Sequence, residues 1–571
     1  MDIKKAIPIG VEFYKEIIDN DYYYIDKTML IRDLLIQKSK VTLFTRPRRF
    51  GKTLAQSMLR TFFEEEVTVD GMIVDNSKYF TGKKIMGAGG QYTGHMGKYP
   101  VIFLSMKSAK QPDFETAYEN LVDEIIKEYD RHRYLLNGNY LAEDIKERYT
   151  AILTRKAGNA SYTKSLAFLS DCLEKYHQEK TIILIDEYDV PLENAYFRGF
   201  YDRMVDFIRS LLESALKTND SLQFAVITGC LRISRESIFT GLDNLDVVSI
   251  LDENYAEYFG FTQDEVDSLL SFYGISYTAD DVKKWYDGYL FGHTEVYNPW
   301  SIINYARDIL YHNTEFPKPY WSNTSSNSIV RKMVAEADSS TVQEIESLLA
   351  GDTIEKQIHE NITYGDIGQA EDNLWNFLFF TGYLKVAGRN FRSDEIYLEM
   401  KIPNREVRYI YNNTIKEWFR QKTKAIDFSG LYNAILSGDT VTMEGFLKKQ
   451  LRESISYMDS AEKFYHGFLL GLLSSLQGYK KKSNMESGDG RYDILLIPYD
   501  EQQPAVILEL KRAKKFTEME KLCHEALRQI DGRHYDSGFI EEGYPNILKY
   551  GICFCKKSCM VKLGKNVDGS N

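Results

Sequence analysis

The sequence predicts an α/β protein with a parallel β-sheet in its N-terminal half and a second, smaller α/β sheet near its C-terminus. The first sheet is predicted by short apolar runs of strand length that alternate with stretches of helical periodicity. Continuous apolar runs are typical of strands buried on both faces, as in parallel sheets. Two more runs near the C-terminus predict the second sheet. The runs lie at residues 41–44, 100–105, 181–185, 222–229, 494–497 and 505–510.

Length and composition describe an ordinary globular protein. The chain has 571 residues, 43% of them hydrophobic and 27% charged, and the usual domain size predicts about two to four domains. A net charge of −12 argues against a protein coated with nucleic acid. The N-terminus has no apolar core of signal-peptide length, and no run reaches the ~18 apolar residues of a membrane span. We therefore expect a cytoplasmic protein without membrane contact.

The six cysteines are too few for a disulfide framework in a chain of this length. Cys553 and Cys555 alternate within a strand-like run, and no second pair completes a zinc set. We expect these two cysteines to be buried in a strand.

Between the predicted strands, the spacing of apolar residues predicts helices, and their order along the chain follows that of an α/β domain. A lead-in and a helix precede the first strand, a helix follows it, and a Gly-rich excursion comes before the second. The helical stretches lie at residues 10–36, 54–63, 114–129 and 162–177, and the excursion at residues 81–98.

Residues 46–53, RPRRFGKT, have the composition of a phosphate-binding loop, and we call them the phosphate loop. They lie between a predicted strand and a predicted helix, where backbone N–H groups and a helix N-terminus can wrap phosphates. Gly51 and Lys52 would contact the phosphates, and the Thr53 hydroxyl would bind Mg²⁺. The GxxxxGK[ST] template has glycine where this chain has Arg46, a position that serves only the turn's backbone. Arg46 and two further arginines are expected to add positive charge. The alternative is a basic surface turn before an ordinary helix.

Two carboxylates follow the buried run at residues 181–185 and are expected at the carboxyl edge of the sheet, where α/β ligands bind. Asp186 would hold Mg²⁺, usually through water, and Glu187 would be the base that polarises the attacking water. Taken alone, the pattern also fits a strand with a solvated acidic turn. Beside the phosphate loop, it predicts binding and hydrolysis of ATP.

The run at residues 222–229 ends in a hydroxyl residue and a glycine. Thr228, near its tip, can sense the γ-phosphate, and Arg232 can neutralise charge in the transition state. The alternative for both is that they are ordinary turn residues.

Seven segments in this order resemble the motifs of the bacterial AAA-ATPase-like family, a relative of the archaeal ATPase and STAND branches of P-loop enzymes. The segments are YYYIDKTMLIRDLL, TRPRRFGKT, IILIDEYDVPL, ITGCLRISRESIFTGLDNL, WYDGYLFG, VYNPWSI and YWSNTSSN. In that family the RRFGK[ST] loop commonly lacks its first glycine, so Arg46 follows the pattern. The resemblance implies that Arg49 and Phe50 belong to the nucleotide site. It also implies a sheet of the additional-strand type with the acidic strand beside the loop strand, and a helical lid from Tyr258 to about Asn327.

The C-terminal runs place an acid and an amine on one strand. Residues i and i+2 share one face of a strand, so Glu509 and Lys511 point the same way, opposite Asp493 at the start of the neighbouring strand. Asp493 and Glu509 would be ligands of Mg²⁺, and Lys511 would position or activate the attacking water. The alternative from geometry is a β-hairpin with a surface ion pair.

GRYDILL, VILELK and a following helix resemble the PD-(D/E)XK nuclease superfamily. The resemblance matches Asp493, Glu509 and Lys511 to its three central positions. It matches Gln529 to the accessory glutamine and Glu462 to the acid of the first helix.

We therefore expect four segments: a P-loop AAA-ATPase-like domain at residues 1–255, a helical lid at 256–330, a mostly helical connector at 331–451 and a nuclease-like domain at 452–571. The connector shows helical periodicity and one hairpin pattern, from Asn390 to Ile402. With ATP and Mg²⁺ as cofactors and nucleic acid as partner, the predicted function is an ATP-gated nuclease. The alternative is a STAND-like switch in which nucleotide state controls partner binding or homo-oligomer formation. In this alternative the C-terminal domain is a recognition module that does not cleave.

Overall fold

In the computed structural model the chain divides into two units. The first consists of Met1–Ser326 and Glu355–Arg408, and the second of Asn327–Ile354 and Tyr409–Asn571. The predicted division into four segments stays a prediction. The residues that the structure describes are 5–232, 238–239, 243–275, 279–312, 316–321, 330, 339–360, 364, 371–392, 395–423, 428–454, 462–473, 476–483, 486–487, 490–491, 493–500, 502–532, 544, 546–556 and 558–564.

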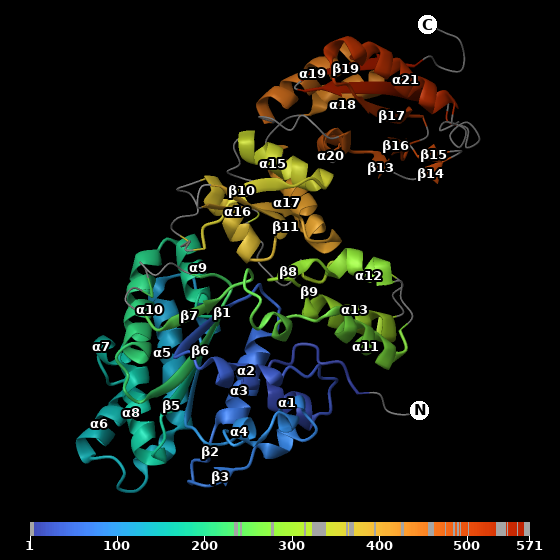
Figure 1. Ribbon diagram of the computed structural model, residues 1–571. Coiled ribbons are helices and arrows are strands. Elements are labelled where there is room, and N and C mark those ends of the chain that lie inside the picture. The colour runs from blue at the N-terminus through green and yellow to red at the C-terminus, as the bar shows by residue number, and fades with distance from the viewer. Residues whose placement is uncertain are drawn as a thin grey trace. The chain divides into compact units, whose positions relative to one another are not determined.

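A five-stranded parallel sheet forms the centre of the first unit, as the apolar runs predict (Figure 1). Two of its strands, which carry the phosphate loop and the acidic pair, are buried along their whole length and therefore read as uninterrupted apolar runs. Because all strands are parallel, their carboxyl ends lie at one edge of the sheet. The order is β4 (Val101–Ser105), β5 (Thr181–Asp186), β6 (Leu222–Gly229), β1 (Val41–Thr45) and β7 (Leu245–Val248).

The prediction that the acidic strand lies beside the loop strand is wrong. β5, which ends in Asp186, pairs with β4 and β6, and β6 pairs with β1. β6 therefore lies between the two and is the additional strand of the implied sheet type. Sequence periodicity could not reveal this, because an apolar run indicates burial but not which strand it hydrogen-bonds.

Helices cover both faces of this sheet (Figure 1). α3 (Lys52–Phe63) contacts β4, β5 and β6, and α5, α8 and α10 lie on the opposite face. The helices predicted over residues 114–129 and 162–177 are confirmed as α5 and α8, although α8 begins three residues later than expected. The bounds are α5 (Phe114–Arg131), α8 (Ser165–His177) and α10 (Tyr201–Leu216). Shorter elements around them are α1 (Tyr14–Asp19), α2 (Met29–Gln37), α4 (Gly90–Thr93), α6 (Glu143–Leu153), α7 (Asn159–Tyr162), α9 (Val190–Arg198) and the hairpin of β2 (Glu66–Val67) and β3 (Ile73–Val74).

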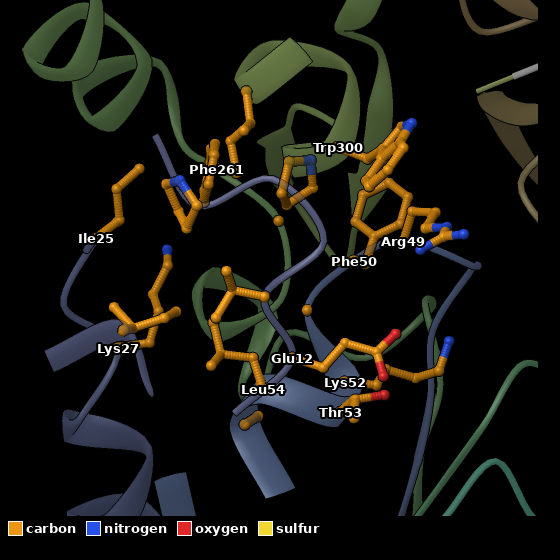
Figure 2. Close-up of a pocket in the computed structure, with 18 of the residues that line it drawn as sticks. Glu12, Ile25, Lys27, Arg49, Phe50, Lys52, Thr53, Leu54, Phe261 and Trp300 are labelled. Atoms are coloured by element: carbon orange, nitrogen blue, oxygen red, sulfur yellow. The ribbon is translucent and has the colours of Figure 1, made fainter. Parts of the chain in front are cut away.

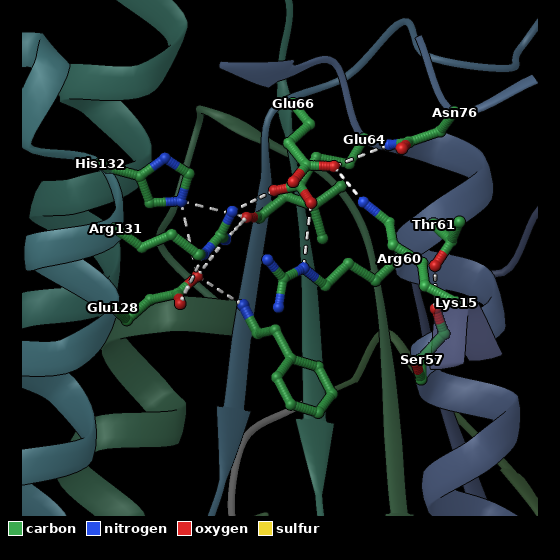
Figure 3. A network of polar contacts seen from close by, with 12 residues as sticks. Lys15, Ser57, Arg60, Thr61, Glu64, Glu66, Asn76, Glu128, Arg131 and His132 are labelled. Atoms are coloured by element: carbon green, nitrogen blue, oxygen red, sulfur yellow. Dashed lines mark hydrogen bonds and ion pairs between the residues drawn. The ribbon is translucent and has the colours of Figure 1, made fainter. Parts of the chain in front are cut away.

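Buried charges occupy the outer edge of β4, the last strand of the sheet (Figure 3). The Phe103 N–H donates to Glu128 Oε1 at 2.8 Å, and Arg131 donates to the Val101 carbonyl. Arg131 also pairs with Glu64, whose side chain is 3% exposed. Burial by itself raises the pKa of Glu64, but Arg131 and other cations outweigh it and hold the pKa at about 2. Side chains thus satisfy edge groups that would otherwise be open to pairing with another strand.

The first unit continues with a small, mainly helical region and a three-stranded sheet. The region contains α11 (Gln263–Tyr273), α12 (Ala279–Tyr286), the hairpin of β8 (Tyr289–Phe291) and β9 (Thr294–Val296), and α13 (Pro299–His312). The sheet has the order β10-β12-β11, and α16 precedes its hairpin. The hairpin predicted from Asn390 to Ile402 is confirmed, since β11 and β12 pair antiparallel. The bounds are β10 (Ile354–Gln357), α16 (Glu371–Phe380), β11 (Lys385–Arg392) and β12 (Glu395–Lys401).

The second unit is built on a five-stranded mixed sheet in the order β13-β16-β17-β18-β19. β17 and β18 are parallel and the other pairs are antiparallel. One face packs against α18, α19 and α20, and the other against α21. The bounds are β13 (Tyr479–Ser483), β16 (Ile494–Pro498), β17 (Ala505–Arg512), β18 (Ile547–Cys555), β19 (Ser558–Leu563), α18 (Ser429–Ser437), α19 (Thr440–Ser454), α20 (Glu462–Leu473) and α21 (Met519–Gly532). This unit also holds α15 (Ser339–Ala350), most of α17 (Arg405–Thr423) and the hairpin of β14 (Glu486–Ser487) and β15 (Gly490–Arg491).

The cysteine prediction is confirmed. Cys553 and Cys555 lie in β18 and are buried, and all six cysteines are free. Within the described part of the chain, no helix combines the length and the apolar character that crossing a membrane requires.

Candidate functional site

The phosphate loop joins the carboxyl end of β1 to the start of α3. Gly51 is the N-cap of α3 and has φ of 82°, and Arg49 has φ of 70°. Glycine adopts this left-handed conformation without cost, whereas Arg49 is held there by its surroundings. The first N–H groups of a helix have no partner within it, so the start of α3 is a place where an anion can bind.

Lys52 is buried at the centre of the phosphate loop, with 5% of its surface exposed. Its Nζ donates to the carbonyl oxygens of Arg46 and Pro47, both at 2.9 Å, and lies 3.6 Å from Cys230 Sγ. None of these partners carries a full charge. The ammonium is therefore suited to an exchange of partners in which phosphate oxygens replace the carbonyls.

Asp186 connects the acidic strand to the loop helix and to β6. The Thr53 hydroxyl donates to Asp186 Oδ2 at 2.7 Å, and the Thr228 hydroxyl donates to Asp186 Oδ1 at 2.6 Å. Burial, followed by the charge of Glu187, raises the pKa of Asp186. The structure thus brings four of the predicted residues together: Thr53, Asp186, Glu187 and Thr228. Glu187 has φ of 54°, a strained conformation for a residue with a side chain, and its N–H donates to the Thr228 hydroxyl at 3.4 Å.

The arginines of the phosphate loop do not act as a common positive surface. Arg46 is fully buried and donates from Nη1 to the Thr45 and Val248 carbonyls, both at 3.0 Å. The Arg48 guanidinium pairs with Glu193, and that of Arg49 lies 4.5 Å from the centre of the Trp300 ring. The expectation that Arg46 adds positive charge to the loop surface is therefore wrong. Its side chain is long enough to turn into the core behind the turn.

Two further predicted residues have other neighbours. The Phe50 ring is 1% exposed and packs against Tyr289 and Phe291, with ring centres 4.9 and 5.3 Å away. Arg232 Nη1 donates to Glu360 Oε2 at 3.3 Å, so an ion pair holds its guanidinium. Their roles in a nucleotide site stay predictions.

Beside the phosphate loop lies a cavity of about 340 Å³ within the first unit (Figure 2). Lys52, Thr53 and Glu187 line one end of it. Arg49 and Trp300 face Ile25 and other apolar groups across the space (Figure 2). Arg46 is not among the lining residues.

Sequence reasoning missed residues that support this site. Asp189 is buried, and its Oδ2 accepts from the N–H groups of Cys230 (2.7 Å) and Leu231 (3.2 Å). Burial raises its pKa to about 6. It ties the end of β5 to the turn after β6, and the only signal in the sequence was its place in the acidic IDEYD segment. Trp300, within VYNPWSI, gave no signal of contact with the phosphate loop.

In the second unit, β16 and β17 bring the predicted metal-binding residues together. Asp493 Oδ2 accepts from the Leu510 N–H at 2.8 Å, which holds its carboxylate against β17. Lys511 Nζ donates to Glu509 Oε1 at 3.3 Å and to Gln529 Oε1 at 2.7 Å. α21 thus supplies Gln529 to the same cluster, as the resemblance implies.

Glu509 is buried, with 2% of its surface exposed, so the alternative of a surface ion pair on a hairpin is wrong. α21 covers this face of the sheet. Burial, followed by the charge of Asp493, raises the pKa of Glu509 to about 7. Its Oε2 has no hydrogen-bond partner among the residues that the structure describes. A buried carboxylate oxygen without a partner next to a second carboxylate fits a divalent cation, which supplies the missing charge.

The number of carboxylates suits a hard ion. No group of three or more His, Cys, Asp and Glu side chains suited to a metal is found among the residues that the structure describes. Mg²⁺ is commonly held by one or two carboxylates and keeps several waters, so Asp493 and Glu509 are a sufficient pair.

The first helix of the predicted site is α20. It begins at Glu462, but the side chain of Glu462 lies outside the described residues. His466, one turn along, has its Nε2 2.7 Å from the Asp493 carbonyl oxygen. This contact positions the start of β16 and could not be assigned from the sequence, which showed only that the two side chains share a helix face.

Comparison with known proteins identifies two domains. Residues 8–239 match a family model described as "Predicted AAA-ATPase", and residues 460–563 match the model of the PD-(D/E)XK nuclease superfamily. The chain therefore carries a predicted AAA-ATPase domain and a C-terminal PD-(D/E)XK nuclease superfamily domain. It is also 25% identical over 448 residues to a protein of Azotobacter chroococcum mcd 1 described as "Uncharacterized protein in vnfD 5'region", covering 76% of this chain and 75% of that protein.

Proposed function

We propose that this protein binds and hydrolyses ATP and that nucleotide state controls a metal-dependent nuclease domain that cleaves nucleic acid phosphodiesters. One observation carries the proposal: two separate clusters in one chain each join carboxylates to a buried or partly buried lysine. In the first, Lys52 is followed by Thr53, whose hydroxyl donates to Asp186. In the second, Lys511 donates to Glu509, and Asp493 accepts from the neighbouring Leu510 N–H. Both arrangements suit phosphate chemistry, in which charge stabilisation does most of the catalysis.

At the first site, Lys52 leaves its loop carbonyls and binds the β- and γ-phosphates. The Thr53 hydroxyl and Asp186, which are hydrogen-bonded to each other, would hold Mg²⁺, whose charge would offset that of the phosphates. Glu187 accepts a proton from the attacking water. The Thr228 hydroxyl, which donates to Asp186, senses the γ-phosphate by contacting it. Arg49, Phe50 and Gly51 are the remaining nucleotide-binding residues of the phosphate loop. Arg232 leaves its ion pair with Glu360 and neutralises charge in the transition state.

At the second site, Asp493 and Glu509 would hold a divalent ion, whose charge would stabilise the developing charge on a phosphodiester. Lys511 orients the attacking water, and Gln529 fixes the Lys511 ammonium through their 2.7 Å hydrogen bond. Glu462 is proposed as a further acid of this site. Because burial raises the pKa of Glu509 to about 7, a bound cation would favour loss of its proton.

A panel of single- and double-stranded DNA and RNA, incubated with Mg²⁺ or Mn²⁺ and with or without ATP, tests the proposal. The wild-type protein is expected to cleave at least one substrate, and cleavage should be lost in Asp493→Asn and in Lys511→Ala. Lys52→Ala should abolish the effect of ATP without changing the metal requirement. Arg512→Ala is a matched control, because Arg512 follows Lys511 on β17 and its side chain is exposed. Absence of cleavage on every substrate in every condition would refute the nuclease half.

A nucleotide-controlled switch without cleavage is the second candidate, and a contact of the phosphate loop favours it. The Cα of Gly382 lies so close to Pro47 that a Cβ added there would be 2.9 Å from Pro47 Cβ. A movement of Pro47 toward Gly382 on nucleotide binding would therefore displace residues 381–383. This candidate predicts that the particle size measured by light scattering depends on ATP and on Lys52, with no strand scission.

A further inference from the structure

Three buried cysteines of the second unit lie together between α21 and the sheet. Cys523 of α21 and Cys553 and Cys555 of β18 belong to one cluster, whose other buried members are Ala513 and Met519. Cys553 and Cys555 alternate along β18 and therefore face the same side of the sheet as each other. The proposed function gives these thiols no role.

Two of the three thiols contact each other. α21 approaches β18 so closely that a Cβ added to Gly551 would collide with the Cys523 carbonyl oxygen. Cys553 follows two residues later on the same side of the strand, and its thiol hydrogen-bonds to that of Cys523. Cys523 Sγ also donates to the Met560 carbonyl oxygen at 3.3 Å. The backbone thus brings both side chains to one point, which is the geometric condition for a disulfide.

The two thiols of this pair are not equivalent. The hydrogen bond from Cys553 lowers the pKa of Cys523, against the opposing effect of burial, and the same bond raises the pKa of Cys553. By contrast, burial raises the pKa of Cys172 to about 12 and that of Cys230 to about 11. Because the thiolate is the nucleophilic form of cysteine, Cys523 is the better nucleophile of the pair.

The pair lies at the outer part of the sheet, although both thiols are buried. Cys523 contacts the main chain of β19, the last strand of the sheet. Leu522 and Met560, which pack against the cluster, are half-buried. Lys562 of β19 pairs with Glu520 of α21 at 3.0 Å, and both side chains are exposed. Because an exposed ion pair adds little stability, brief opening of this edge admits a molecule as small as a peroxide.

We propose that Cys523 and Cys553 are an oxidative modification site, at which hydrogen peroxide converts the two thiols to a disulfide. The Cys523 thiolate attacks one peroxide oxygen and breaks the O–O bond. Cys523 becomes a sulfenic acid, and the hydroxide that leaves takes up the thiol proton to form water. The Cys553 thiol then attacks the sulfenic sulfur, so that an S–S bond forms and a second water leaves. The two thiols lose two electrons, and one peroxide is reduced to two waters.

The disulfide lies beside residues of the nuclease-like site. Cys553 is the register partner of Lys511 on β17, and α21 also carries Gln529, which accepts from Lys511 at 2.7 Å. A covalent S–S bond is shorter than the contact of two hydrogen-bonded thiols, so oxidation draws α21 toward β18 and moves Gln529 relative to Lys511. This consequence for cleavage rests on the proposed function, whereas formation of the disulfide does not.

Peptide mapping of the full-length protein by mass spectrometry, after hydrogen peroxide treatment and blocking of free thiols, tests the modification. We expect a disulfide between Cys523 and Cys553 that dithiothreitol reverses. Cys172 and Cys230 are internal controls, because they are also buried and free, and should react at least about ten-fold more slowly. Cys555→Ser is the matched control variant, because Cys555 shares the strand and the cluster, and it should leave the disulfide unchanged.

Serine variants in the Cys555→Ser background separate the roles of the two thiols. With Cys553→Ser, dimedone should trap Cys523 as a sulfenic acid, because no neighbouring thiol remains to displace water. With Cys523→Ser, Cys553 should stay unmodified, and circular dichroism establishes that both variants are folded. Oxidation of Cys172 as fast as that of Cys523 would overturn the proposal. So would a wild type in which Cys523 and Cys553 stay reduced in excess peroxide.

Strand cleavage before and after oxidation tests the consequence for Lys511. Oxidised wild-type protein is expected to cleave at least about five-fold more slowly than reduced protein, whereas peroxide should not change cleavage by Cys523→Ser. Unchanged cleavage by protein that contains the disulfide would overturn the link to Lys511 and leave the modification site standing. A wild type that forms the disulfide but cleaves nothing in either state would overturn the proposed nuclease and leave the modification site standing.

Discussion

Arg46→Gly creates the strict template of a phosphate-binding loop, yet we expect it to destabilise the protein without improving nucleotide binding. The Arg46 guanidinium donates to the Thr45 and Val248 carbonyls at 3.0 Å and so joins the ends of β1 and β7. It also lies 5.4 Å from the ring centre of Phe259 and 4.9 Å from that of Phe291. Glycine removes both hydrogen bonds and leaves a void between the rings.

The expected size follows from two opposing effects. Truncating a large buried side chain typically costs about 3–5 kcal/mol. Part of this cost is offset, because Arg46 Nε and Nη2 have no hydrogen-bond partner in the described part of the chain and burial lowers the Arg46 pKa to about 9. We expect Arg46→Gly to lower the free energy of unfolding by about 3 kcal/mol. Arg46→Met fills most of the space without a charge and should change it by less than about 1 kcal/mol.

Urea denaturation followed by circular dichroism measures the stability of both variants, and calorimetric titration measures their affinity for ATP. Because the Arg46 side chain does not line the cavity, the ATP affinity of each folded variant should stay within about three-fold of wild type. A glycine variant with wild-type stability and tighter ATP binding would refute the reasoning, since it would mean that Arg46 only obstructs the loop.

Three further predictions concern other parts of the molecule. Arg131→Ala leaves the buried carboxylates Glu64 and Glu128 without their main partner, so urea denaturation should show a loss of about 3–5 kcal/mol. Burial raises the pKa of Glu406 to about 7, above its unfolded value of about 4.3, so its contribution to stability is present at low pH and is lost as the pH rises through 7. Its contribution to the free energy of unfolding should therefore fall by about 2–3 kcal/mol between about pH 5 and 8, and the decline in Glu406→Gln should be smaller than that of the wild type by this amount. EDTA should abolish any nuclease activity, Mg²⁺ should restore it, and Asp493→Asn should not respond to Mg²⁺.

Each of these predictions can fail clearly. Wild-type stability in Arg131→Ala would mean that the two glutamates are protonated or solvated. An identical pH dependence in wild type and Glu406→Gln would assign the decline to another group. Cleavage that persists in EDTA would exclude the role proposed for Asp493, provided that no metal copurifies with the protein.

The sequence predicted the local arrangement of the residues at both sites well. Residues that are adjacent in the chain encode the strand, the loop and the helix around Lys52. Their order could therefore be predicted without tertiary information. The i and i+2 spacing of Glu509 and Lys511 likewise places them on one side of a strand whatever the rest of the chain does, and the structure confirms their contact. Metal and nucleotide binding at these residues stay predictions.

The sequence predicted long-range neighbours less well. It placed the acidic strand beside the loop strand, whereas β6 separates them, because pairing depends on how the connecting helices cross the sheet. Geometry alone favoured a surface position for Glu509, and only the packing of α21 over the sheet decides that it is buried. The contact of Arg49 with Trp300 joins residues that no local pattern relates.

The phosphate loop shows most directly what the sequence determines and what the tertiary structure determines. The sequence by itself determined that residues 46–53 form a turn between a buried strand and a helix, with Lys52 and Thr53 at the helix start. Only the tertiary structure decided that Arg46 turns into the core, that Asp186 meets Thr53 and Thr228, and that a large apolar cavity adjoins the loop. The physical reason is that periodicity and turn chemistry act between near neighbours, whereas burial and cavity shape depend on every segment packed around a site.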